Sequence, residues 1–202
     1  MNRRFLAGMA LTLVGTCAQA QTSIDEGDWL IRLGATYIDP SSSGSNLNGS
    51  TLEVDGHAGA TFNVTYMMTR NVGIELLAAL PFKHDIKLDD VTIATTRLVP
   101  PTVTLQWHQP IGRIVPYAGI GLNFTEFFNA RFLESDADLS LDDSAGLSAQ
   151  IGFDFVIAER WLLNADVRYI DMSTDVKIDG EEIGNVKIDP WTIGLNLGFR
   201  FN

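Results

Sequence analysis

Apolar and polar residues alternate with a period of two along eight stretches of this chain. In residues 28–38, for example, Trp29, Ile31 and Leu33 share one face, whereas Arg32 lies on the other. Because successive side chains of a β-strand point to opposite faces, this pattern predicts strands with two chemically different faces. The predicted strands cover residues 28–38, 57–68, 72–83, 97–107, 117–125, 145–155, 161–169 and 191–201.

The two faces of these predicted strands differ in a way that indicates a membrane. One face is apolar and carries no charged residue, while the other is built from Gly, Thr, Ser and Asn with a few charges. A soluble β-sandwich turns a face rich in Lys and Glu to water, which this pattern lacks. The sequence therefore predicts an all-β fold, an eight-stranded antiparallel transmembrane β-barrel whose apolar face meets lipid and whose small polar face lines a narrow lumen.

Loop lengths and aromatic residues predict the orientation of this barrel. The connections at residues 69–71, 108–114 and 158–160 are short, and the others are longer and polar. With the strands placed alternately up and down, aromatic residues gather at both ends in two girdles. We therefore expect short periplasmic turns, longer extracellular loops, a place in the Gram-negative cell outer membrane, and N- and C-termini in the periplasm.

The first twenty residues have the pattern of a secretory signal peptide. Arg3 and Arg4 precede a short apolar segment at residues 5–14, and Ala18-Gln19-Ala20 is a small-x-small cleavage site. We expect residues 1–20 to be removed, which leaves one outer-membrane barrel domain at residues 21–202. Cys17, the single cysteine, would leave with the signal peptide, so that no thiol chemistry or disulfide is expected in the mature chain.

Composition narrows the possible partners. The formal net charge of −11 becomes −13 once the signal peptide is removed, although only 19% of residues are charged and 46% are hydrophobic. An acidic chain without a basic patch is a poor nucleic-acid binder, so no nucleic acid is expected. The expected partners are outer-membrane lipid and lipopolysaccharide, small hydrophobic solutes, and the barrel-assembly machinery during biogenesis.

Several segments, in order and at matching spacing, resemble the outer membrane protein W family, which also includes alkane-uptake barrels. The resemblance implies an eight-stranded barrel that admits small hydrophobic molecules by passive uptake and releases them sideways through its wall. Two positions depart from the family pattern. Some relatives place an aromatic residue where this chain has Arg168, and this chain ends on Asn202 rather than on an aromatic residue. The matching segments are residues 71–82, 98–102, 116–121, 161–169 and 189–191.

Two prolines match a pair that the family carries in its fourth strand. Pro100 and Pro101 donate no backbone hydrogen bond, so strand pairing weakens where they lie. A weakened seam is a candidate lateral opening. The alternative is that these prolines only bend or end the strand.

The inward-facing residues of the predicted strands form two candidate groups. The apolar group could line a path for a substrate, or could be ordinary packing; it comprises Leu30, Ile38, Leu77, Leu98, Leu162 and Ile170. The charged group must pair or meet water, and predicts a salt-bridge plug rather than ion selectivity. It comprises Arg32, Glu75, Asp154, Asp166, Arg168 and Arg200.

Enzymatic and metal functions have little support in the sequence. Of the three histidines, we expect His57 to begin the second strand, His84 to end the third and His108 to lie in a periplasmic turn. His84 beside Asp85 does not have a spacing that indicates a catalytic triad, and the acidic residues between 134 and 143 lack the calcium-loop pattern. No catalytic residue, metal site or cofactor is expected. The alternative function is a structural or adhesive barrel with a filled lumen and no transport.

Overall fold

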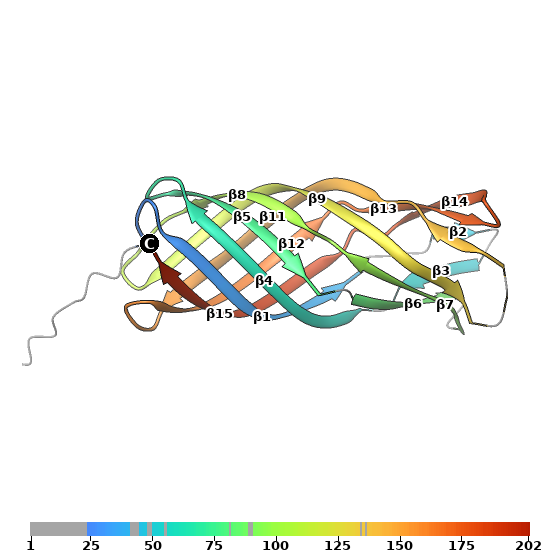
Figure 1. Ribbon diagram of the computed structural model, residues 1–202, viewed down its shortest axis with the longest axis horizontal. Coiled ribbons are helices and arrows are strands. Elements are labelled where there is room, and N and C mark those ends of the chain that lie inside the picture. Colours follow the sequence, from blue (N-terminus) through green and yellow to red (C-terminus); the bar gives the residue numbers. More distant parts are fainter. Residues whose placement is uncertain are drawn as a thin grey trace, which may run out of the picture.

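The computed structural model describes residues 24–40, 45–47, 50–54, 56–80, 82–88, 91–133, 135 and 137–202. The predicted signal peptide, residues 1–20 with Cys17, lies outside the described residues. All the elements found are β-strands (Figure 1). Within this part of the chain no helix is long and apolar enough to cross a membrane.

Eight antiparallel strands close into a barrel, which confirms the predicted fold. They follow one another around the wall in the order β11-β12-β15-β1-β4-β5-β8-β9, and β9 pairs back with β11. The strands lie at the predicted places along the chain. Their bounds are β1 (Trp29–Asp39), β4 (His57–Met67), β5 (Val72–Ala79), β8 (Thr102–His108), β9 (Ile114–Phe132), β11 (Ser144–Val156), β12 (Trp161–Ile170) and β15 (Trp191–Phe201).

The outer surface of the barrel is apolar, as the alternation predicts. Leu33 on β1, Ile120 on β9 and Leu195 on β15 are 59%, 72% and 66% exposed. Exposed apolar side chains recur along all the barrel strands, and a continuous apolar surface of this extent indicates contact with lipid. The opposite phase of each strand, which includes Arg32 and Glu75, is buried inside the barrel.

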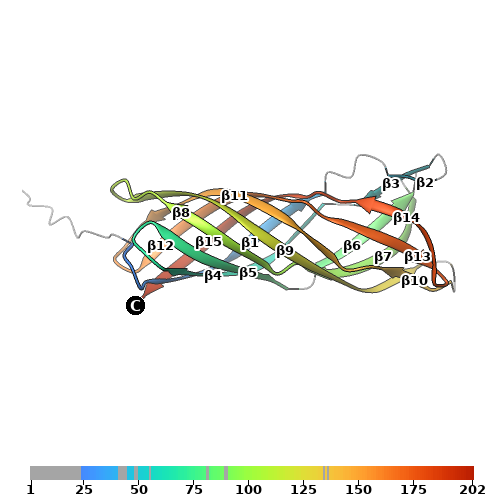
Figure 2. The same cartoon turned by 90° about the horizontal axis from the view of Figure 1, so that it is seen from above.

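One end of the barrel carries the short connections, and we call it the turn end. Residues 68–71 join β4 to β5, residues 109–113 join β8 to β9, and residues 157–160 join β11 to β12. The C-terminus lies at this end as well (Figures 1 and 2). Short turns and the C-terminus on the same side are what the predicted periplasmic orientation requires.

At the other end, the extended end, the chain forms further strands, mostly where the sequence predicts polar loops. The additional strands prolong the barrel wall well beyond the ends of β1 and β12 (Figure 2). They pair as β7–β9, β6–β7, β3–β6 and β2–β3 on one side and as β10-β13-β14 on the other. Their bounds are β2 (Ser45–Leu47), β3 (Ser50–Val54), β6 (Phe82–Leu88), β7 (Val91–Val99), β10 (Leu139–Leu141), β13 (Ser173–Ile178) and β14 (Glu181–Lys187).

On the extension strands whose side chains the structure describes (β7, β10, β13 and β14), the alternation is inverted: apolar side chains point inward and charged ones point outward. On β13, Val176 is buried, whereas Lys177 is on the other phase and donates hydrogen bonds of 2.8 and 2.5 Å to the two carboxylate oxygens of Asp142. These hydrogen bonds to the Asp142 carboxylate raise the pKa of the Lys177 amine. The inversion indicates that the wall leaves the lipid and enters water, so that its apolar side must now face inward.

The wall is interrupted where the two prolines lie. The fourth predicted strand, residues 97–107, is not continuous: β7 ends at Val99 and β8 begins at Thr102. On the turn-end side Leu77 pairs with Thr102, and on the extended side Phe82 pairs with Leu98. Between these pairs, residues 78–80 and 99–101 form no ladder with each other in the described part of the chain.

Candidate channel and lateral seam

The lumen is closed at the turn end by a small apolar cluster. Ile24, which precedes β1, packs there with Met67 and Val115, and all three are at most 1% exposed. Leu30 and Leu162, which were predicted to line a substrate path, belong to this cluster instead. They lie between the turn end and the charged residues, because Leu30 precedes Arg32 on β1. Ile24 could not be predicted, since it is a single apolar residue in a polar segment.

Above this cluster lies a layer of buried ions. Arg32 donates two hydrogen bonds to Asp154, with Nε 3.0 Å from Oδ1 and Nη2 2.7 Å from Oδ2. Its Nη1 lies 3.2 Å from Glu75 Oε2, and Arg168 Nη2 lies 2.7 Å from Glu75 Oε1. All four side chains are at most 1% exposed. Glu75 on β5 therefore joins Arg32 on β1 to Arg168 on β12, the strand that lies opposite β5 in the ring.

Uncharged polar side chains enclose this ion layer. Asn164 Nδ2 donates to Asp154 Oδ1 and to the hydroxyl of Tyr117, both at 3.0 Å, and the Arg32 guanidinium lies 5.5 Å from the Tyr117 ring centre. His108, predicted in a turn, is instead the last residue of β8: it is fully buried, stacks on Tyr117 and is bonded to Gln106. The turn is shorter than expected, because β8 continues one residue beyond Trp107.

Two of the predicted charges take other places. Asp166 is buried, but it accepts hydrogen bonds from the amides of Gln150 and Asn196. Arg200 lies at the rim of the turn end, where Nη1 is 3.7 Å from Asp28 and Nη2 donates to the backbone oxygen of Glu159. The chain enters β1 at that rim and brings Asp28 to Arg200, which the strand phase alone does not show.

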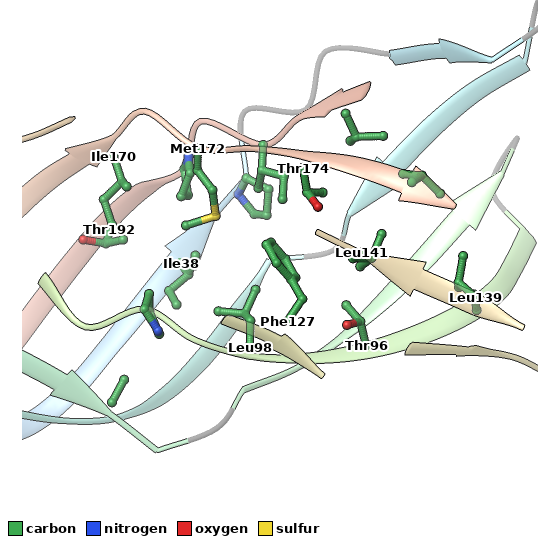
Figure 3. A pocket seen from close by; sticks show the side chains of 18 of the residues that line it. Ile38, Thr96, Leu98, Phe127, Leu139, Leu141, Ile170, Met172, Thr174 and Thr192 are labelled. Carbon is green, nitrogen blue, oxygen red and sulfur yellow. The ribbon is translucent and has the colours of Figure 1, made fainter. Parts of the chain in front are cut away.

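The part of the lumen toward the extended end contains an apolar cavity of about 350 Å³ (Figure 3). Four of the predicted substrate-path residues line it: Ile38, Leu77, Leu98 and Ile170. Every described side chain that lines it is apolar, a proline or a threonine. The volume is at the lower end of the roughly 300–1,000 Å³ found for small-molecule sites.

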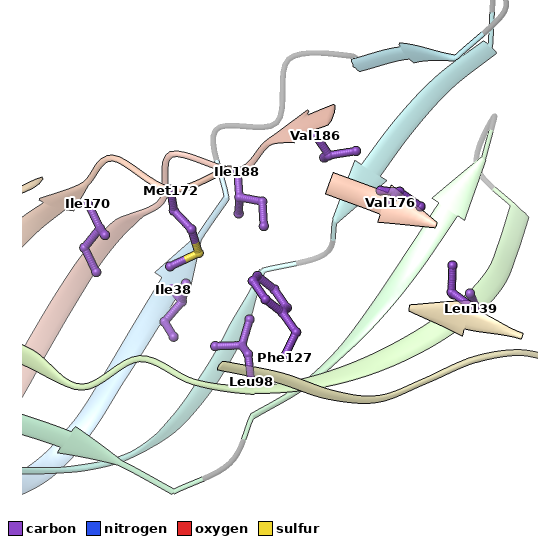
Figure 4. Close-up of a cluster of buried hydrophobic side chains, with 10 residues drawn as sticks. Ile38, Leu98, Phe127, Leu139, Ile170, Met172, Val176, Val186 and Ile188 are labelled. Atoms are coloured by element: carbon purple, nitrogen blue, oxygen red, sulfur yellow. The ribbon is translucent and has the colours of Figure 1, made fainter. Parts of the chain in front are cut away.

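Much of the cavity wall comes from strands that the sequence did not predict. Phe127, Met172, Val176 and Ile188 converge on its interior from β9, β13 and the segments beside β14 (Figure 4). They follow the same alternation as the barrel strands but with inverted polarity. A search for apolar residues opposite charged ones, as at Val176 and Lys177, would have found the signal.

The cavity reaches the interrupted part of the wall. Leu77 and Ala79 line it from the β5 side, and Leu98 and Pro100 line it from the β7 side. These are the residues on either side of the unpaired stretch. The wall between cavity and lipid is thus held here by side-chain packing without a hydrogen-bonded ladder.

The residues considered for enzymatic and metal chemistry lie partly outside the described residues. His57 begins β4 as expected, and His84 is on β6, within that strand rather than at its end, with its side chain outside the described part. Glu134 and Asp136 are also outside it. Across the residues that the structure describes, no group of three or more His, Cys, Asp or Glu side chains is placed to hold a metal ion.

Comparison with known proteins agrees with this geometry. The chain is 35% identical to outer membrane protein W of Salmonella typhi over the full length of both chains. The crystal structure of the outer membrane protein OprG from Pseudomonas aeruginosa matches it with a TM-score of 0.80 and 30% identity, covering 90% of this chain and 99% of that one. The solution structure of the E. coli outer membrane protein W matches with a TM-score of 0.64 and 34% identity, covering 88% and 99%.

The sequence model of the OmpW family matches residues 25–201, which include every strand of the barrel. The curated relatives are named as outer membrane proteins, in agreement with the lipid-facing surface of this chain. The chain belongs to the OmpW family and is an eight-stranded β-barrel of the outer membrane.

Proposed function

We propose that this barrel takes up small hydrophobic molecules passively from outside the cell and releases them sideways into the membrane. The observation that carries the proposal is the position of the cavity: it is apolar, closed toward the turn end, and bordered by the unpaired stretch at Pro100. Hydrophobic uptake is also what the resemblance to alkane-uptake barrels implies.

The closed lumen argues against passage straight through the barrel. A solute moving toward the turn end would have to separate the Arg32–Asp154 and Arg168–Glu75 pairs. Breaking a buried pair costs about 3–5 kcal/mol, because each charge is left without a partner. An apolar molecule offers nothing to replace the lost interactions, so the seam is the easier way out.

The backbone at the seam supports the sideways route. Alternate residues of an antiparallel strand direct their backbone groups to opposite neighbours. The Pro101 carbonyl accepts a hydrogen bond from Phe124 N of β9, so the backbone groups of Pro100 face β5 and β6. Pro100 has no N–H to donate there, and its carbonyl accepts a hydrogen bond at 3.2 Å from the hydroxyl of Thr102, the first residue of β8.

The alternative is a structural or adhesive barrel without transport, and the two filled layers of the lumen favour it. The cavity favours uptake, because a purely structural barrel gains stability from filling such a space. Lipopolysaccharide and the barrel-assembly machinery stay predicted partners. The absence of enzymatic activity also stays a prediction.

The proposal is tested by uptake of radiolabelled n-decane into cells that lack related barrels and produce variants of this chain. Leu77→Arg places a charge in the cavity, and Pro100→Ala with Pro101→Ala restores two backbone N–H groups, of which the one at position 100 faces the seam. Both variants are expected to lower uptake toward that of cells without the barrel. Leu77→Met and Pro116→Ala, a proline of β9 outside the cavity, are the matched controls and keep uptake.

Two results would contradict the proposal. If the unaltered barrel does not raise decane uptake, the structural role is correct. If it does but the proline variant transports as well as Pro116→Ala, the solute leaves by another route. Heat-modified migration in gels and protein amount in the outer membrane are checked first for every variant.

A further inference from the structure

Three threonines lie where the apolar cavity meets the polar lumen. Thr36 on β1, Thr61 on β4 and Thr192 on β15 are the lining residues of those strands that lie nearest the turn end. The three strands are neighbours in the wall, so the threonines form one side of the cavity floor, which we call the threonine floor. Thr192 lies beside Ile170 at this level (Figure 3).

The threonine floor has unused hydrogen-bonding capacity. The Thr36 and Thr61 hydroxyl oxygens are 2.9 Å apart, and Thr61 can also donate to Asn196 Oδ1 at 3.5 Å. If Thr61 donates to Asn196, Thr36 donates to Thr61 and keeps acceptor lone pairs free. The Thr192 hydroxyl makes no hydrogen bond with any described side chain or loop backbone group, although Thr192 is only 6% exposed.

Thr36 and Thr192 occupy diagonal positions on neighbouring strands, on the same inward face of the barrel. Thr36 pairs with Gly194 across the β1–β15 ladder, and Thr192 is two residues away on the same face. Such diagonal positions have Cα atoms about 7–8 Å apart and side chains nearer than that. The opposite partner of Thr36 on β4 is Gly59, which has no side chain to fill the space.

The rest of the cavity offers little for a polar group. Thr174 donates to the Asp142 backbone oxygen at 2.6 Å, and Thr96 points its hydroxyl to the Arg97 backbone oxygen at 3.5 Å. No charged side chain lines the cavity among the described residues. An ionised ligand would therefore lose its water without gaining a counter-ion, which is costly.

We propose that the threonine floor binds the hydroxyl of an uncharged amphipathic molecule, a long-chain alcohol, whose apolar chain fills the cavity toward the extended end. The alcohol donates to Thr36 Oγ1 and accepts from the Thr192 hydroxyl. This inference rests on the proposed uptake function and adds a preference to it. Long-chain alcohols are taken up faster than alkanes of equal length, and carboxylates are excluded.

The test compares uptake of n-decane, 1-decanol and decanoate, each radiolabelled, by cells that produce the barrel, with uptake by cells without it subtracted. The variant is Thr36→Val with Thr192→Val, which replaces each hydroxyl by a methyl group of similar size. Thr96→Val, a threonine of the same cavity near the extended end, is the matched control. Loss of one neutral hydrogen bond is expected to lower the decanol-to-decane ratio about 2- to 12-fold, and loss of both bonds is expected to lower it further.

The expected result is that the double variant keeps decane uptake and loses the preference for decanol, whereas Thr96→Val keeps both. A decanol-to-decane ratio that is the same in the double variant and the unaltered barrel would overturn the threonine floor, and so would uptake of decanoate equal to that of decanol. Failure of the uptake function itself gives a different result, because then neither decane nor decanol enters faster than into cells without the barrel.

Discussion

Arg32 and Asp154 are 122 residues apart in the chain, yet they form a two-bond ion pair in the middle of the lumen, with Nη2 2.7 Å from Oδ2 and both side chains fully buried. The pair links β1 to β11, which are not neighbours in the wall. It therefore holds the barrel across its interior, in addition to the ladders that hold it around the circumference.

Removing one member of this pair is expected to destabilise the barrel strongly. Arg32→Met leaves Asp154 buried with one amide partner and should lower the free energy of unfolding by about 3–5 kcal/mol. Urea unfolding in lipid vesicles measures this. The double variant Arg32→Met with Asp154→Leu should lose less than the sum of the single variants, since no unpaired charge remains; additive losses would show that the two residues are not coupled.

The inversion of the alternation along β9 predicts where the lipid ends. Ile120 and Glu126 are both outward and exposed on this strand. Ile120→Arg should cost about 2–4 kcal/mol of stability, the value for a cation near the middle of the bilayer, whereas Glu126→Arg should cost less than about 1 kcal/mol. Vesicle unfolding measures both, and equal costs would place Glu126 within the lipid.

The two closed layers of the lumen are expected to act in series. Leu162→Ala opens the apolar cluster and Arg168→Ala opens the ion layer, but each leaves the other layer in place. Ion conductance in planar bilayers should therefore stay near that of the unaltered barrel for each single variant and rise only in the double variant. An increase from Leu162→Ala alone would mean that the ion layer does not close the lumen.

The contact between Lys177 and Asp142 predicts a titration outside the membrane. The hydrogen bonds that Lys177 donates to the Asp142 carboxylate raise the pKa of Lys177. A raised pKa means that the contact contributes fully below the value of about 10.4 for an unfolded lysine and is lost as the pH rises through the higher folded value. Asp142→Asn should lower the pKa seen by NMR of the Lys177 amine, and an unchanged pKa would show that the contact is absent in solution.

The sequence determined the wall of the barrel and most of its interior charges. A strict period of two with an uncharged apolar face leaves one arrangement that satisfies every backbone group in lipid, a closed barrel with the other face inside. Arg32, Glu75, Asp154 and Arg168 are inward for that reason alone. Which of them pair could not be read, because strand phase fixes a side but not the distance across the lumen.

The chain beyond the lipid was misread for a related reason. Segments such as residues 173–187 have charged residues on one face, and this pattern predicts polar loops, although Val176 and Val186 are buried. In water the charged face of a strand points outward and the apolar face points inward. The outward face of one strand is therefore apolar within the membrane and charged beyond it.

The tertiary structure alone decided the site. The sequence placed two prolines in the fourth strand, but only the pairing of that strand with β9 on one side and its break toward β5 and β6 on the other makes them a seam. The cavity beside them likewise depends on residues from five or more strands meeting at one level. Local alternation fixes which way each side chain points, whereas a cavity and a seam exist only where distant strands come together and leave space or an unpaired edge between them.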